Sequence, residues 1–412
     1  MEKKAKSQLM IGRVPEQWLY YILCGAFCGL SLGTSTFTIL GVCLLAVWVF
    51  SGEFLRKRHR FLNASWLWPV LIMICLMWLG LIYSPDRFGL GIKFAMKSHY
   101  WLYALVVGGI LITGNRFQNL LWAFFTGLLL NAMIGFLQLA GLFPTFFKER
   151  YAGISGGYNT LAILLILGIM VASFYFRYSK NTKVKLGCIF LMVVYFIHLI
   201  ILKGRGGYFT FAILSPIIAY NFSGGRHLLI TFLVYLLFLG VMSLSPFVQE
   251  RVIKTINNVR IQMNASDEIA WGKQYSEDER IQGTDRIYMW RWAIDIFLEH
   301  PFTGAGTGGY KSRIVEGGGQ KAITHPHNNF LYMAANHGIF GVLALCWLFL
   351  LLFKSGYRYR HKPAGFFVFS STLVIFVGGI TDTQVLDAGP AFLLGITTGL
   401  QSSLEKKIFE KI

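Results

Sequence analysis

The sequence predicts an all-α membrane protein that crosses the bilayer about twelve times. Of its 412 residues, 55% are hydrophobic and only 14% are charged, which is about half the charged share of a soluble globular protein. Apolar runs of roughly 16–25 residues recur along the chain, and a run of this length crosses a bilayer as a helix. Basic residues, in contrast, gather in a few short connections.

The predicted spans follow one another closely, except across one long polar interval. They lie near 16–33, 35–50, 65–83, 99–113, 119–140, 158–176, 186–203, 208–222, 228–246, 329–353, 366–381 and 388–403. The chain therefore divides into a membrane part with nine spans (1–246), a polar loop domain (247–328), and three further spans with a terminal tail (329–412).

The basic connections give the orientation. Clusters of Lys and Arg fill 56–60, 177–185 and 354–362, and both chain ends are basic as well. Twelve spans put all of them on one side of the membrane, and the positive-inside rule makes that side the cytoplasm. The formal net charge of +19 is explained in this way, without nucleic acid as a partner.

The loop domain 247–328 then lies on the opposite side. We expect two amphipathic helices in it, over 245–263 ("SPFVQERVIKTINNVRIQM") and 286–301 ("RIYMWRWAIDIFLEHP"), because charged residues alternate with apolar and aromatic ones in both. The polar stretch 264–285 between them is predicted to be an irregular excursion.

Several classes of protein are disfavoured. The spans contain almost no acidic residues, which an ion-coupled transporter usually needs. No Walker A motif occurs, and all six cysteines lie in apolar segments without metal-ligand spacing, so we interpret them as packing residues.

One arginine stands in the very short connection between the seventh and eighth spans. In "LKGRGGYF", Lys203 precedes Arg205 and two glycines follow it. A planar guanidinium bonds two phosphate oxygens at once, and glycines let a ligand approach the backbone. We expect Arg205 to bind phosphate at the outer boundary of the membrane. The alternative is an arginine that only anchors a tight turn at the interface.

Two more arginines, Arg286 and Arg291, lie on the second helix predicted in the loop domain. They are not one helical turn apart, so they project in different directions. We expect one of them to face a pocket, and the alternative is a helix whose charges are only solvated. The following turn, Gly304–Tyr310, has GxGxxG spacing, but no strand precedes it, so we expect a packing turn in place of a dinucleotide site.

Histidines mark the mouth of the tenth span in "THPHNNF". His325 and His327 flank a proline, and Asn328 follows. No third ligand at zinc spacing and no HExxH motif occurs, so we expect no metal. A neutral histidine accepts a proton from a hydroxyl nucleophile, and Asn328 can orient a sugar. We expect His337, farther along the span, to be packed.

Lys97 precedes the fourth span on the outer side, one turn after Lys93. We expect these lysines to attract lipid phosphates. Ordinary anchoring at the membrane interface explains them as well.

In these residues the chain resembles the O-antigen ligases, a family within a superfamily of O-antigen ligases and polymerases. The family motif of His, then Asn, Ser or Gln, nine residues and GxxG is matched by His327–Asn328 and Gly338–Gly341. Arg205 matches the family's arginine after the span two before the large loop. Arg286–Trp290 matches its Arg-x-x-x-Trp helix, ahead of an HPxxGxGxGxY-like segment at His300–Tyr310.

This resemblance implies a glycosyltransferase of lipopolysaccharide biosynthesis, in the bacterial inner membrane with its active site facing the periplasm. It would transfer O-antigen from undecaprenyl pyrophosphate to a sugar hydroxyl of the lipid A core, with inversion and without metal or cofactor. His327 would act as base, while Arg205 and Arg286 hold the pyrophosphate. The implied substrate-binding residues are Arg205, Arg286, Arg291, Asn328, Lys97 and Tyr310.

Three alternatives remain at this stage. A repeat-unit polymerase uses the same lipid-linked donor with a growing glycan as acceptor. A lipid or glycan flippase needs a polar passage to the cytoplasm, which nearly charge-free spans disfavour. A structural membrane scaffold would make the Arg and His positions indifferent to substitution.

Overall fold

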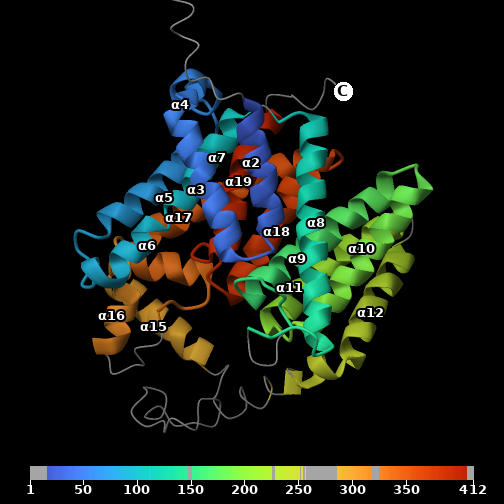
Figure 1. Ribbon diagram of the computed structural model, residues 1–412. Coiled ribbons are helices and arrows are strands. Elements are labelled where there is room, and N and C mark those ends of the chain that lie inside the picture. The colour runs from blue at the N-terminus through green and yellow to red at the C-terminus, as the bar shows by residue number, and fades with distance from the viewer. Residues whose placement is uncertain are drawn as a thin grey trace, which may run out of the picture.

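A computed structural model describes residues 16–110, 112–146, 151–224, 228–250, 252–253, 256, 285–316 and 324–405. Within these ranges every regular element is a helix, as Figure 1 shows. The all-α prediction is therefore confirmed.

Each predicted span coincides with one long helix, and shorter helices lie between them. The elements are α2 (Glu16–Gly29), α3 (Thr34–Phe50), α4 (Glu53–Lys57), η1 (Arg58–Arg60), α5 (Leu67–Leu79), η2 (Arg87–Gly91), α6 (Ile92–Met96), α7 (His99–Gly109), α8 (Gly114–Leu139), α9 (Tyr158–Tyr178), α10 (Thr182–Ile201), α11 (Arg205–Phe222), α12 (Leu228–Leu244), α15 (Asp285–Glu299), α16 (Gly309–Glu316), α17 (Asn329–Arg358), α18 (Pro363–Thr381) and α19 (Ala388–Glu405).

Not all of these helices have the length and hydropathy of a membrane span. In the described part of the chain, α8, α9, α10, α17 and α18 do, and α3 with the residues through Arg60 forms a sixth candidate that is bent by 78°. The helices α5 and α12 are apolar but shorter. The count of about twelve crossings therefore stays a prediction.

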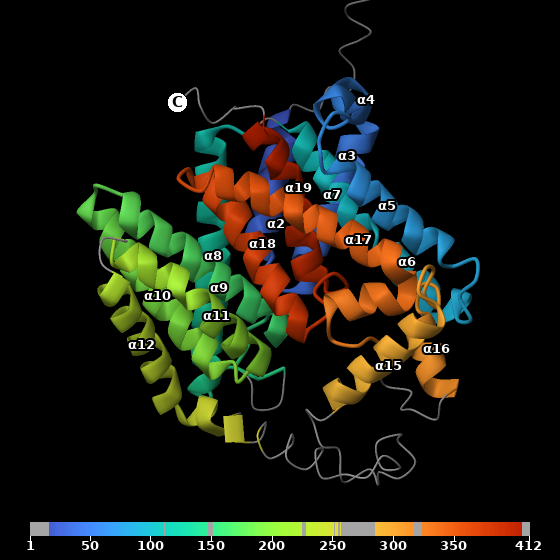
Figure 2. The ribbon, with the colours of Figure 1, turned by 180° about the vertical axis from the view of Figure 1, so that it is seen from behind.

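The loop domain is described in part. Residues 246–250 are helical, at the start of the first predicted helix, and α15 coincides with the second. The predicted excursion at 264–284 lies outside the described residues. Figures 1 and 2 show α15 and α16 side by side at one end of the molecule, next to the bent part of α17.

The centre of the bundle is formed by α9, α18 and α19. Every residue of α9 from Leu161 to Phe174 is buried, as expected of a helix that is apolar all round. Helix α19 is also buried along most of its length, although it contains Thr, Ser and Gln, and it packs along α7 and α18. Small side chains in α19 allow this close approach between helices.

Helix α17 is broken at Gly338, which has a left-handed φ of 61°. A side chain at this position would overlap the carbonyl group of Phe302. The segment 301–306 crosses the break, since the amide of Ile339 donates to the carbonyl of Pro301 (2.8 Å) and that of Ala305 donates to Ala335 (2.8 Å). Gly338 thus forms the corner of α17 where the loop domain docks.

The turn Gly304–Tyr310 completes this docking. Thr307 donates its hydroxyl to the carbonyl of Met77 at the end of α5 (2.6 Å), and Ser84 donates to the carbonyl of Thr307 (2.8 Å). Gly304, Gly306 and Gly308 have left-handed φ values between 64° and 87°, which a side chain would oppose. This is the packing turn predicted from the sequence.

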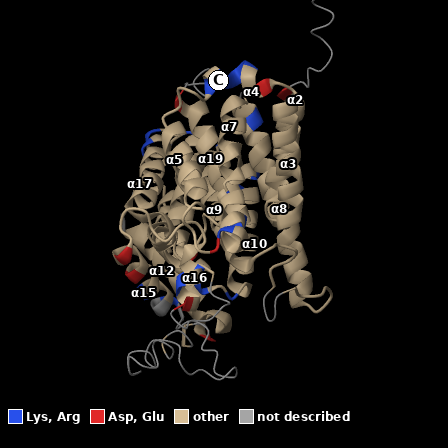
Figure 3. Ribbon diagram, turned by 90° about the vertical axis from the view of Figure 1, so that its left-hand side faces the viewer, with Lys and Arg blue, Asp and Glu red and all other residues tan. Residues whose placement is uncertain are grey.

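Both ends of the described chain lie at the end of the molecule opposite α15 and α16 (Figure 1). Glu16 pairs with Lys57 of α4 and with Arg116 of α8, while Glu405 accepts a hydrogen bond from Ser65 (2.9 Å). Figure 3 shows charged residues mostly toward the two ends, with long uncharged stretches of helix between them. This arrangement agrees with chain ends that share one side of a membrane.

Topology can be tested by cysteine labelling in a variant without the native cysteines. Leu298 is 68% exposed on α15, and we expect Leu298→Cys to react with a membrane-impermeant thiol reagent in intact cells. His59, in the basic connection, is the matched control: His59→Cys should react only after permeabilisation. The opposite pattern would reverse the predicted orientation.

Candidate functional site

The histidine stretch meets the connection between α18 and α19. The Nδ1 atom of His327 lies 2.8 Å from a carboxylate oxygen of Asp382. The carboxylate side chain is buried, whereas the His327 side chain keeps 35% of its surface exposed. With Nδ1 held by the carboxylate, the other ring nitrogen of His327 is available to a substrate.

The backbone around His327 is fixed from both sides. Asn328 caps α17, because its side-chain oxygen accepts the amides of Phe330 and Leu331. Its own side-chain amide donates to the carbonyl of Ile380 (3.0 Å), and its backbone amide donates to the hydroxyl of Thr383 (3.1 Å). The side chain expected to orient a sugar therefore joins α17 to α18.

His327 itself has a φ of 49°. A residue with a side chain rarely adopts this left-handed conformation, and local strain of this kind costs about 1–3 kcal/mol. It persists here because Asp382 holds the imidazole of His327 and Thr383 holds the backbone amide of Asn328.

Asp382 is the centre of the hydrogen-bond network. Besides His327, it accepts the side-chain amide of Asn159 at the start of α9 (2.6 Å) and the backbone amide of Thr383 (2.9 Å). Burial alone would raise the pKa of Asp382, but the hydrogen bonds from His327 and from the backbone amide of Thr383 bring it below its usual value. Asp382 therefore stays ionised at neutral pH and accepts a hydrogen bond from Nδ1–H of His327.

Arg286 reaches the same network from α15. It lines a small enclosed cavity of about 10 Å³ together with Asn159, Asp382 and the glycines at the start of α11, room for about one water molecule. Burial lowers the pKa of Arg286, and the charge of Asp382 opposes this shift. The indole of Trp290 donates to the carbonyl of Pro326 (3.0 Å) and so fastens α15 beside His327.

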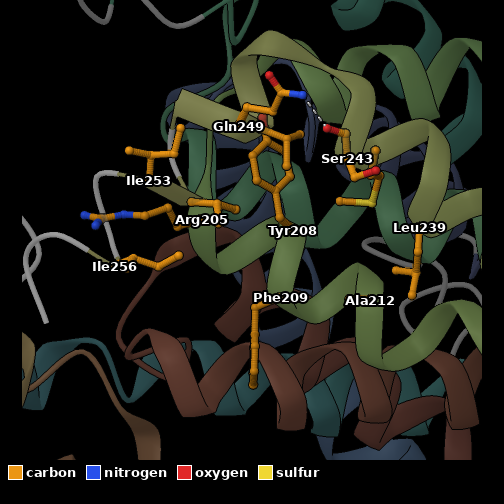
Figure 4. Close-up of a pocket in the computed structure, with 12 residues that line it drawn as sticks. Arg205, Tyr208, Phe209, Ala212, Leu239, Ser243, Gln249, Ile253 and Ile256 are labelled. Atoms are coloured by element: carbon orange, nitrogen blue, oxygen red, sulfur yellow. Dashed lines mark hydrogen bonds between the residues drawn. The ribbon is translucent and has the colours of Figure 1, made fainter. Parts of the chain in front are cut away.

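Arg205 is the first residue of α11 and lies at an apolar groove of about 630 Å³ between α11, α12 and the described residues that follow α12. Figure 4 shows its side chain near Ile253 and Ile256. The next residues, Gly206 and Gly207, line the cavity that contains Arg286 and Asp382. One turn of α11 thus separates the groove from the cavity.

Arg291, Tyr310 and Lys97, the other residues expected to contact substrate, have different surroundings. Arg291 lines a separate pocket between α15 and α16, with Asp295 and Glu299. Tyr310 is fully buried and donates its hydroxyl to the carbonyl of Met289 (2.9 Å). The structure gives it a packing role between α16 and α15 in place of the substrate contact that we expected.

Lys97 faces the connection between α18 and α19. It donates to the carbonyl of Leu386 (2.7 Å), and burial lowers its pKa against the opposing charge of Asp387. Burial in turn raises the pKa of Asp387 to about 7. This lysine thus fixes the segment that carries Asp382, a role that its position in the sequence did not indicate.

The remaining histidines differ from His327. His325 lies beside the hydroxyl of Thr383 (3.0 Å), and burial lowers its pKa to about 3, so it is neutral at physiological pH. His337 is buried just before the break in α17, as expected of a packed residue.

No metal was expected from the sequence, because no third ligand at zinc spacing was found. The structure supplies a third group: atoms of His325, His327 and Asp382 able to bind a metal lie within 4.8 Å of one another. The same side chains take part in the hydrogen bonds described above, so a metal and the His327–Asp382 hydrogen bond are competing uses of this cluster.

Asp382 and Asn159 were missed by the sequence analysis. Asp382 lies 55 residues from His327 along the chain, with no motif that links the two. The available signal was chemical: an acidic residue at the end of an apolar span on the side of His327 needs a charged or hydrogen-bonding partner.

Comparison with known proteins now adds to this geometry. The sequence model of the O-antigen ligase family matches residues 190–346. Over this range the chain is similar to the O-antigen ligases. The matched range extends from α10 into α17 and includes Arg205, Arg286 and His327. No curated protein matches the chain.

This similarity and the apolar helices indicate a multi-pass bacterial membrane protein of the ligase or polymerase type. Asp382 and Asn159 lie outside the matched range. Two residues of the hydrogen-bond network are therefore supplied by segments on either side of the matched range.

We expect Asp382→Asn to lower kcat for glycan transfer by about 10²-fold or more, with little change in KM, because the imidazole loses its anionic partner. Asp387→Asn is the matched control on the same connection. Burial raises the pKa of the Asp387 carboxyl to about 7, and Asn is close in shape to the protonated form. Steady-state kinetics on purified proteins with equal thermal stability make the comparison; equal losses in both variants would contradict a specific role for Asp382.

Proposed function

We propose that the protein transfers a glycan from undecaprenyl pyrophosphate to a sugar hydroxyl of the lipid A core, on the periplasmic face of the inner membrane. The observation that carries this proposal is the His327–Asp382 hydrogen bond, 2.8 Å long, beside the cavity lined by Arg286. A base oriented by a buried carboxylate suits the activation of a hydroxyl nucleophile.

In this mechanism the free ring nitrogen of His327 removes the proton from the acceptor hydroxyl. The oxygen attacks the anomeric carbon of the donor sugar, and the bond between this carbon and the pyrophosphate oxygen breaks. Asp382 stabilises the imidazolium that forms. A single displacement inverts the anomeric centre.

The leaving group is a pyrophosphate, and negative charge develops on the phosphate oxygen that is released from the anomeric carbon as the bond breaks. Arg286 lines the cavity beside the first turn of α11, and Arg205 lines the groove at the same turn. Both supply fixed positive charge for the leaving group. The start of α11 adds the partial positive charge of a helix N-terminus. Preorganised donors of this kind stabilise the transition state without a metal or a cofactor.

A repeat-unit polymerase remains the second candidate, because the matched family covers both kinds of chemistry in its wider group. The two differ in the acceptor. Purified protein with lipid-linked glycan alone distinguishes them: a polymerase extends the glycan on its carrier, whereas a ligase produces nothing until lipid A core is added.

We expect His327→Ala to lower the rate of transfer by about 10²–10⁴-fold while donor binding is retained, since the arginines hold the pyrophosphate. His325→Ala should be milder, because burial keeps this histidine neutral and its Nδ1 atom lies beside the hydroxyl of Thr383. The measurement is transfer in vitro with defined lipid-linked glycan and lipid A core, with and without EDTA. If both variants are inactive and EDTA abolishes transfer, a metal held by His325, His327 and Asp382 replaces the proposed base.

We expect Arg205→Lys to lose about 10²–10³-fold in rate although the charge is kept, because an ammonium group cannot bond two phosphate oxygens in one plane. Arg291→Lys is the matched control, since Arg291 faces the pocket between α15 and α16. The same transfer assay applies. Near-normal transfer by the Arg205→Lys variant would mean that Arg205 only anchors the turn at the membrane interface.

A further inference from the structure

Another pocket lies at the far ends of the helices that carry the candidate site. It has a volume of about 420 Å³ and is lined by the ends of α9, α11 and α17 and by the start of α18. Figure 2 shows α17 running from beside α16 across the molecule to the half that contains the C-terminus. The opposite ends of these four helices carry the residues described above: Asn159, Arg205, His327 and Asp382.

The pocket is basic. Its lining includes residues of two connections, 177–185 and 354–362, which contain Lys and Arg but no Asp or Glu. The positive-inside rule places both connections on the cytoplasmic side. Arg360 and His361 line the pocket, and among the described residues no carboxylate does. An anionic ligand therefore fits the charge of this pocket.

Two guanidinium groups are held against tyrosines of the pocket. The guanidinium carbon of Arg360 lies 4.0 Å from the ring centre of Tyr357, and Arg360 donates to the carbonyl of the same residue (2.9 Å). That of Arg177 lies 4.4 Å from the ring centre of Tyr220, and Arg177 donates to the Tyr220 carbonyl (3.2 Å). An arginine has five N–H donors in one plane, so both side chains can also donate to a phosphate.

The rest of the wall is apolar and aromatic. Phe366 of α18 stacks on Phe174 of α9, with ring centres 4.7 Å apart, and Phe369 lies 6.0 Å from Tyr357. Ile217 contributes from α11. A phosphate alone would leave these side chains uncovered, and apolar surface exposed in a pocket indicates that part of the ligand is apolar as well.

Exposed apolar side chains extend from the pocket toward the middle of the membrane helices. On α11, Ile213 lies one turn before Ile217 and is 45% exposed. On α17, Leu350 lies two turns before Tyr357 and is 66% exposed. Residues spaced in this way share a face of their helix, and α18 contacts both helices. A hydrocarbon chain that leaves the pocket along either helix therefore meets apolar side chains.

We propose that this pocket binds an anionic glycerophospholipid of the leaflet on the side of the chain ends. Its phosphate lies at Arg360, His361 and Arg177, and its acyl chains lie along α11 and α17. Basic pockets between membrane helices on the cytoplasmic side are suited to anionic lipid head groups. A bound lipid contacts all four helices at once, and a ligand that binds only the folded state stabilises it.

The test compares variants of purified full-length protein in detergent, after bound lipid has been removed. Arg177→Gln and Arg360→Gln each remove one guanidinium. Arg358→Gln is the matched control, since Arg358 is exposed in the same basic connection and does not line the pocket. Ile217→Trp fills the pocket without a change of charge, and Ile213→Trp is its control one turn away.

Three probes are added: phosphatidylglycerol, zwitterionic phosphatidylethanolamine, and sn-glycerol 3-phosphate as a head group without chains. Binding is measured by native mass spectrometry, and stability by the midpoint of thermal unfolding. We expect phosphatidylglycerol to bind and to raise Tm of the wild type, and the other two probes to do neither at the same concentration.

Each Arg→Gln variant should weaken phosphatidylglycerol binding by about fivefold or more, which is the usual effect of one basic residue on an anionic lipid. Ile217→Trp should weaken it as well, whereas Arg358→Gln and Ile213→Trp should bind as the wild type does. If an Arg→Gln variant is less stable without lipid, the two Trp variants decide, because they keep every charge.

Unchanged phosphatidylglycerol binding in the Arg177→Gln, Arg360→Gln and Ile217→Trp variants would overturn the proposal. Equal binding of phosphatidylethanolamine would overturn it in favour of a general acyl-chain surface, and equal binding of sn-glycerol 3-phosphate in favour of a site for a soluble anion. Glycan transfer enters none of these measurements, so their outcome is independent of the proposed function.

Discussion

A carboxylate buried at the end of α18 organises the site around it. An unpartnered charge in such a place would cost several kcal/mol, so Asp382 must be surrounded by donors. The structure provides them from three distant parts of the chain: Asn159 at the start of α9, the amide of Thr383, and His327. The requirement to satisfy one charge thereby fixes the position of the residue that we assign as base.

The need to satisfy polar groups also joins the loop domain to the membrane helices. The break in α17 leaves backbone groups without partners in their own helix, and the segment 301–306 supplies partners for several of them at Ala335, Asn336 and Ile339. Because α15 directly precedes this segment, the docking of the segment also positions Arg286 relative to Asp382. Trp290 adds a second attachment at Pro326. Two attachments that follow Arg286 along the chain thus fix the position of α15, and with it the position of Arg286.

The sequence predicted the helices well, because apolar runs of sufficient length leave few other structures possible in a membrane. Arg205, Arg286 and His327 could be proposed from their types and surroundings, and the structure shows Arg286 and His327 both next to Asp382. The corner at Gly338 could not be predicted, since its left-handed backbone depends on the docking of Phe302. Asp382 was missed because a single aspartate after a span carries no spacing that points to a histidine so far away.

The sequence predicted only that Arg286 and Arg291 project in different directions. Helical geometry required them to diverge, but only the packing of α15 on α17 shows which one turns inward. Lys97 and Tyr310 were expected to contact substrate, because residues of these types often bind substrates. In the structure each donates a hydrogen bond to a backbone carbonyl of a neighbouring segment.

The cavity at Asp382 draws on residues from four regions of the chain: Asn159, the glycines of α11, Arg286 and Asp382 itself. During synthesis these regions leave the ribosome in that order, and 223 residues separate Asn159 from Asp382 along the chain. Domains generally form as units once their parts have been made. The proposed reaction centre therefore cannot form until the chain has been synthesised through Asp382, so a shorter nascent chain lacks the carboxylate that orients the proposed base.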